Sequence, residues 1–133
     1  MDDNLERIAE ALRRIMTEGG EGNFAIMTAD ERRNYYIQFA SECGSTSLFG
    51  EAVSNESLTT GNALGPRQEQ RLEELSWLPP EDNCTNYHRE WTEDHDDGVR
   101  ALAGTVMQTF REVYGIPPEQ PIEIELNLDE LDS

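Results

Sequence analysis

The chain has 133 residues, with 28 Asp and Glu residues against 10 basic residues, all of them arginine, so that its net charge is -18 and its pI is near 4.2. Nucleic acids and anionic membranes are bound through basic surfaces, and this composition excludes both as expected partners. The length fits a single domain. The sequence shows no signal peptide and no apolar run of about 18 residues, and we therefore expect a cytoplasmic protein.

The acidic surplus has several interpretations. A high net charge keeps a soluble protein apart from its neighbours, and the absence of lysine fits a genomic or salt-adaptation bias in composition. An acidic surface also favours basic protein clients. A mimic of DNA is disfavoured, because the acidic residues lack the regular spacing of a phosphate backbone.

The first half of the chain predicts one helix followed by three strands. Residues 3–17 carry apolar side chains at helical spacing, and Gly19 ends the helix. Residues 24–28 and 34–40 are short runs rich in aromatic and branched side chains, which is typical of a hairpin, and residues 48–54 form a third run. Three consecutive strands with short connections predict an antiparallel meander.

The second half predicts two helices with a weak strand between them. Pro66 suits the first turn of a helix that ends near residue 75, and residues 87–91 alternate as in a short strand. The strongest apolar stripe of the chain lies in a helix at 94–114, for which Thr92 is the predicted N-cap. This helix must bury its stripe, so we expect it to cover the sheet.

Two further features belong to the C-terminal third. Gly104 lies inside the strongest helix, where glycine costs about 1 kcal/mol relative to alanine, and this predicts a close approach of another element at that point. Residues 121–131 alternate apolar and acidic side chains, which is typical of a half-buried strand. Because the segment is terminal and acidic, an extended tail that becomes ordered only against a sheet edge is the alternative.

No pattern in the sequence predicts an enzyme, a metal site or a cofactor. Cys84, His88 and His95 are close together, but their spacing matches no zinc motif. Neither Cys84 nor Cys43 has a context that would lower a thiol pKa, and the chain has no nucleophile elbow and no phosphate-binding loop. We therefore expect no catalytic residues, no metal ligands and no bound cofactor.

Aromatic residues in the predicted strands are the candidates for protein contact. Large rings anchor many protein interfaces, although they occur as commonly in cores. The leucine-rich helix before Trp77 favours the core for that residue. The candidate protein-binding residues are Tyr36, Phe49, Tyr87 and Trp91.

Several runs of residues resemble those of the TY-Chap domains, which are relatives of the YbjN proteins and of type III secretion chaperones of bacteria. The runs are Tyr36-Ile37-Gln38-Phe39-Ala40, Glu51-Ala52-Val53-Ser54-Asn55 with Leu58, Leu72-x-x-Leu75-Ser76-Trp77-x-Pro79, and Phe110-Arg111-Glu112-Val113-Tyr114-Gly115. We expect structural roles for the motif residues Glu51, Asn55, Leu72, Leu75, Trp77, Pro79 and Tyr114. The chain departs from the family pattern at Ser76, where a glycine commonly precedes the tryptophan.

The resemblance covers residues 1–116, and residues 117–133 are predicted to be an acidic C-terminal extension that serves as an edge strand. It implies an α+β fold, with an antiparallel sheet of three to five strands flanked by helices in the order α-β-β-β-α-(β)-α. It also implies a non-enzymatic, chaperone-like module, often dimeric, that binds a protein or peptide client. The alternative is a structural or regulatory dimerisation domain in which the acidic tail is an exchanged or edge strand.

Overall fold

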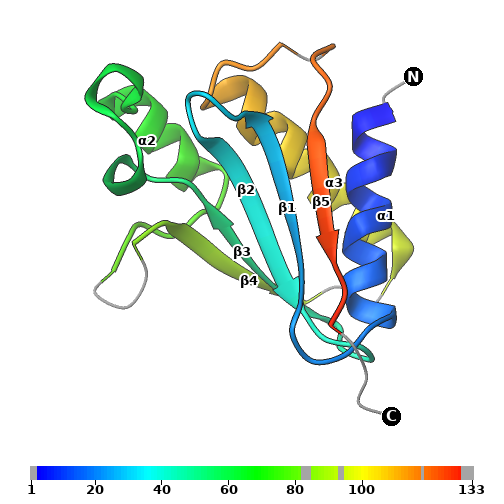
Figure 1. Cartoon of the computed structure of the whole chain (residues 1–133). Coiled ribbons are helices and arrows are strands. Elements are labelled where there is room, and N and C mark those ends of the chain that lie inside the picture. The colour runs from blue at the N-terminus through cyan, green and yellow to red at the C-terminus, as the bar shows by residue number, and fades with distance from the viewer. Residues whose placement is uncertain (1–2, 82–84, 93–94, 118, 130–133) are drawn as a thin grey trace.

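The chain folds into an α+β domain with one antiparallel sheet, as the sequence predicts. A computed structural model describes residues 3–81, 85–92, 95–117 and 119–129. Figure 1 shows the elements in chain order. They are α1 Asp3–Thr17, β1 Asn23–Asp30, β2 Tyr35–Ser41, β3 Ser47–Ala52, the short 3-10 helices η1 Asn55–Ser57 and η2 Thr60–Asn62, α2 Pro66–Glu74, β4 Tyr87–Thr92, α3 Asp96–Glu112 and β5 Glu123–Asn127.

The sheet has five strands in the order β4-β3-β2-β1-β5, and each strand is antiparallel to its neighbours. The first three strands form the predicted meander. β5 lies against β1, with Ile124 opposite Met27, so β5 forms one edge of the sheet. β4 forms the other edge, where Leu78 makes an isolated bridge to His88.

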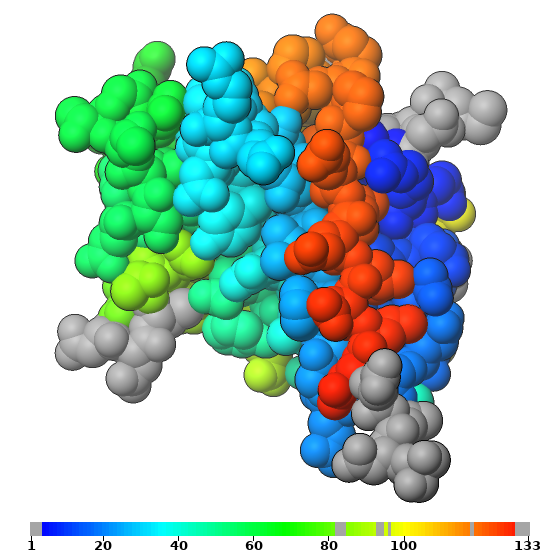
Figure 2. Space-filling model, viewed as in Figure 1, coloured from blue at the N-terminus to red at the C-terminus, as the bar shows by residue number. Residues whose placement is uncertain are grey.

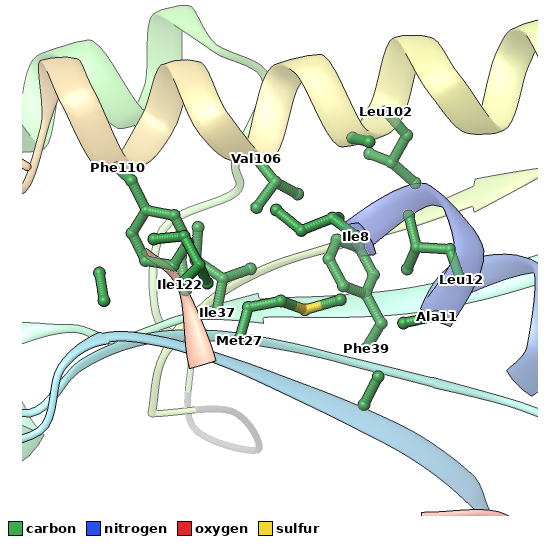
Figure 3. Packing of buried hydrophobic residues seen from close by; sticks show 14 of the residues in the cluster. Ile8, Ala11, Leu12, Met27, Ile37, Phe39, Leu102, Val106, Phe110 and Ile122 are labelled. Atoms are coloured by element: carbon green, nitrogen blue, oxygen red, sulfur yellow. The ribbon is translucent and has the colours of Figure 1, made fainter. Parts of the chain in front are cut away.

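The core lies between one face of the sheet and two helices. α1 packs against α3 and against β1, β2 and β5. In Figure 1 the strands are drawn in front of α3, and α1 packs against α3, so both long helices lie on the same side of the sheet. Figure 3 shows the contact layer, in which Ile8 and Val106 from the helices meet Met27, Ile37 and Phe39 from the strands. Each large side chain buried in this way stabilises the fold by about 1.5–3 kcal/mol.

Polar groups inside this core have hydrogen-bond partners. The indole N–H of Trp77, a residue that is 1% exposed, donates to Oγ1 of Thr109 at 3.2 Å. The hydroxyl of Tyr114 donates to the carbonyl oxygen of Val53 at 2.7 Å, and burial raises the pKa of Tyr114 well above its usual value. The first bond joins the segment after α2 to α3, and the second joins the segment after α3 to the residue that follows β3, so both fix how distant parts of the chain pack.

The turn after α2 explains the departure from the family pattern at Ser76. Ser76 has a φ of 82°, in the left-handed region that favours glycine. The amide N–H groups of Ser76 and Trp77 donate to the carbonyls of Glu73 and Leu72 at 3.0 Å each, which is a Schellman motif. A glycine at this position would make the same turn without strain.

Two predictions about the strongest helix are wrong. Its N-cap is His95 and not Thr92, because Thr92 pairs with Ser47 as the last residue of β4. Gly104 is not a point of close approach, since a Cβ atom built there would meet no atom within 4 Å. Close approach occurs at other glycines, among them Gly50 in β3, where a Cβ atom would lie 2.6 Å from Phe39 and 2.7 Å from Trp91.

Candidate functional site

The face of the sheet opposite α1 and α3 carries a strip of apolar side chains with acidic side chains near it. We call it the open face. Strand register places its side chains in rows that run across the sheet. The first row, from β5 to β4, consists of Asn127, Phe24, Ala40, Phe49 and Glu90. The second row consists of Glu125, Ile26, Gln38, Glu51 and His88. Glu123, Thr28 and Tyr36 begin a third row.

Two hollows lie on the open face, which faces the viewer in Figure 2. The first, which we call the apolar hollow, has a volume of about 290 Å³. It is lined by Phe24, Ile26, Gln38, Phe39, Ala40, Phe49 and Glu51. The second, which we call the acidic hollow, has a volume of about 550 Å³. It is lined by Arg7, Ile26, Thr28, Glu31, Glu123, Ile124 and Glu125. Ile26 belongs to both linings, so the two hollows adjoin.

The apolar hollow is built from side chains that the strands leave uncovered. Phe49 is 38% exposed, and Ala40 beside it is also exposed. Phe24 and Ile26 are half-buried. The ring of His88 stacks on Phe49 at a centroid distance of 6.3 Å, and this contact supports the exposed ring from one side. Apolar surface that stays in water at the centre of a sheet is typical of a contact site.

The charged residues at the strand positions of the open face are all acidic. Its strand positions carry Glu51, Glu90, Glu123 and Glu125, and none of them is an arginine. Glu51 accepts a hydrogen bond from the Gln38 amide at 2.9 Å. Arg7 of α1 reaches the rim of the acidic hollow. The apolar strip therefore has Glu90 at its β4 end and two further carboxylates, Glu51 and Glu125, in the neighbouring row.

A third depression follows the outer side of β5. It has a volume of about 350 Å³ and lies between this strand and α1. Its apolar lining comes from Ala11, Ile124 and Leu126. Two acidic and two basic residues of α1 complete it, namely Glu6, Glu10, Arg7 and Arg14. Unlike the strand positions of the open face, this groove carries charges of both signs.

The structure separates the four predicted binding residues into two pairs. Phe49 and Tyr36 lie on the open face, where the hydroxyl of Tyr36 accepts from the Asn86 amide at 3.2 Å. Trp91 points to the helical side and packs against Trp77 at 5.1 Å. Tyr87 is buried on that side too, and burial together with the nearby Glu69 raises its pKa to about 12. We keep only the first pair in the candidate site.

Sequence reasoning missed three residues of the site, Phe24, Ile26 and Ala40. The signal was present in β1, because large apolar residues occur in both of its alternating sets, Met27 in one and Phe24 and Ile26 in the other. A strand with one covered face needs only one such set. The second set, to which Phe24 and Ile26 belong, was therefore available for contact outside the core.

The residues of the quoted family motifs have varied locations. Leu72, Trp77 and Tyr114 are buried in the core. Asn55 holds a loop through two hydrogen bonds with the backbone of Leu64, at 3.0 Å and 2.6 Å. The remaining motif residues are more accessible: Leu75 and Glu51 are half-buried and Pro79 is exposed.

The described part of the chain contains no group of three His, Cys, Asp or Glu side chains that could hold a metal ion. Cys43 is exposed, with its thiol 3.4 Å from the carbonyl oxygen of Thr17, whereas Cys84 lies outside the described residues. None of the described helices has the length and apolar character needed to cross a membrane.

Comparison with protein-family models gives one match. Residues 4–126 match the family described as "TY-Chap3: T3SS (YopN, CesT) and YbjN peptide-binding chaperone 3". No curated protein and no solved structure matches the chain. The family match extends past residue 116 and through most of β5. Because the match covers nearly the whole sequence, the chain belongs to this family of peptide-binding chaperones, as the quoted motifs predicted.

Proposed function

We propose that this protein is a non-catalytic module that binds an extended segment of a client protein on its open face. The observation that carries the proposal is the strip of Phe24, Ala40 and Phe49 on an uncovered sheet face of a protein with a net charge of -18. A charged, soluble protein gains nothing from apolar rings in water. A client that covers them would release water from apolar surface, which stabilises the complex.

The alternative from the sequence is a dimerisation domain with an exchanged or edge strand. β5 is at the edge of the sheet, and Leu126 on it is half-buried beside α1. An uncovered strand edge can pair with a second chain. In that case the assembly state should depend on protein concentration, and sedimentation of the full chain over a hundredfold concentration range would detect a monomer–dimer equilibrium.

The test of the proposed function uses the full chain and an array of unrelated 15-residue peptides. We expect a subset of the peptides to bind, with dissociation constants below about 1 mM, confirmed by calorimetry in physiological salt. The binding site is tested with Ala40→Glu, which puts a charge into the strip. The matched control is Ala101→Glu, which lies on the exposed surface of α3. Only the first substitution should weaken binding. If no peptide binds the unmodified chain, the proposed function is wrong.

A further inference from the structure

The two hollows of the open face differ in chemistry, and their centres lie a short distance apart. The apolar hollow is centred on β2, and the acidic hollow lies between β1 and β5. With about 4.8 Å between strands and about 6.6 Å between successive side chains on one face, their centres are roughly 10 Å apart. An extended chain rises about 3.3 Å per residue and presents every second side chain to the same side. Two or four residues of a bound segment therefore span the two hollows.

The acidic hollow has an excess of negative charge. Glu31, Glu123 and Glu125 line it, whereas Arg7 is its one basic residue. Within the residues that the structure describes, none of these three carboxylates forms an ion pair. Arginine or lysine on a partner would find complementary charge there, and a carboxylate on a partner would be repelled.

We propose that the client segment carries an apolar side chain followed or preceded, at a distance of two or four residues, by arginine or lysine. This inference rests on the proposed function and specifies its client. The apolar side chain contacts Phe24, Ala40 and Phe49. The basic side chain reaches Glu123 and Glu125 across Ile26, which the two hollows share.

The same charges disfavour a second copy of this chain as the occupant. Two open faces brought together would place Glu90, Glu123 and Glu125 of each copy near the same residues of the other, with no arginine at the strand positions of either face. Like charges across an interface oppose association. A basic client removes this repulsion, and its binding should weaken as salt screens the attraction.

The test uses four synthetic 13-residue peptides and fluorescence anisotropy with the full chain. The probe has one phenylalanine, with arginines two and four residues after it, in a serine and glycine background. One comparison peptide has glutamates in place of the arginines, and another has serine in place of the phenylalanine. The fourth has the probe's composition but carries both arginines eight and more residues from the phenylalanine. This last peptide separates the proposed spacing from general attraction to an acidic protein.

Two double substitutions test the acidic hollow on the protein side. Glu123→Gln with Glu125→Gln removes two charges from the hollow. Glu56→Gln with Glu73→Gln removes two exposed charges elsewhere and is the matched control. Each exposed carboxylate that loses a contact with the probe should lower the affinity for the probe by about 1.4- to 5-fold. We therefore expect the affinity to fall by about 2- to 25-fold for the first pair and by less than about 2-fold for the control.

The outcomes are distinguishable. The inference is supported if the probe binds more tightly than the other three peptides and if its affinity falls only in the Glu123→Gln, Glu125→Gln variant. Equal binding of the probe and its rearranged counterpart, or equal losses in both double variants, overturns the inference while peptide binding itself stands. If none of the four peptides binds and the peptide array is also silent, the inference and the proposed function are both wrong. A dimer that Ala40→Glu dissociates would assign the open face to a second copy and overturn the inference as well.

Discussion

Replacing Ser76 by glycine should raise the free energy of unfolding. Ser76 follows α2 with a φ of 82°, its side chain is exposed, and its carbonyl oxygen accepts a hydrogen bond from Arg89 at 3.2 Å. The substitution keeps every one of the backbone bonds in this turn. It removes the contact between Cβ and the backbone that makes a left-handed conformation unfavourable for serine.

The magnitude follows from two opposing effects. Relief of the left-handed conformation contributes about 1–2 kcal/mol. The greater freedom of glycine in the unfolded chain takes back about 0.4–1 kcal/mol. At the midpoints of these two ranges the net gain is about 0.8 kcal/mol, which corresponds to a rise in melting temperature of about 2–4 °C. Urea denaturation followed by circular dichroism measures the first quantity, and a thermal scan measures the second.

Ser57→Gly is the matched control, because Ser57 is also exposed but has a negative φ. There, glycine brings only the cost in the unfolded chain, and we expect stability to fall by about 0.4–1 kcal/mol. Opposite signs for the two substitutions would support the reasoning. If Ser76→Gly lowered stability as much as Ser57→Gly does, the account of the turn, and with it the reason for the departure from the family pattern, would be refuted.

Three further predictions concern the core and the edge strand. Gly50→Ala should lower the free energy of unfolding by about 1–3 kcal/mol, because the added Cβ atom collides with Phe39 and Trp91. Gly104→Ala has open space around it and should raise the free energy of unfolding by about 1 kcal/mol. Urea titrations that rank the two variants the other way would contradict the packing described for β3. Tyr114→Phe removes the hydrogen bond to Val53 and should cost about 1–3 kcal/mol. Because the pKa of Tyr114 is raised in the folded state, above about pH 10 its hydroxyl loses the proton in the unfolded chain first, so the free energy of unfolding falls as pH rises. The decline between about pH 9 and 11 should therefore be shallower in the Tyr114→Phe variant. Equal declines in the two proteins would show that Tyr114 does not cause the pH dependence. Truncation after Gly115 removes β5 and the buried Ile122, and circular dichroism should show loss of cooperative unfolding, which an unchanged urea midpoint would disprove.

The sequence predicted only some of the residues of the candidate site. Alternation in a strand assigns its residues to two faces, but it does not say which face the helices cover. In β4, Trp91 lies on the helical side of the sheet, where it packs against Trp77 and Phe39. Both contacts come from distant parts of the chain, so the sequence around Trp91 does not specify them. Phe49 could be proposed from its residue type alone. Its neighbours on β1 and β2 became visible only with the strand register.

Local chemistry decided the elements, and long-range packing decided how they are used. The apolar spacing of residues 3–17 predicts α1 at its observed bounds, and the short aromatic runs predict the meander, because helical and strand periods depend on neighbours in sequence. The pairing of β5 with β1 joins residues about 100 positions apart, and no local pattern specifies such a partner. That pairing places Glu123 and Glu125 beside Ile26. The sequence by itself therefore determined an acidic α+β protein, while the tertiary structure alone set an apolar strip next to an acidic hollow on one open face.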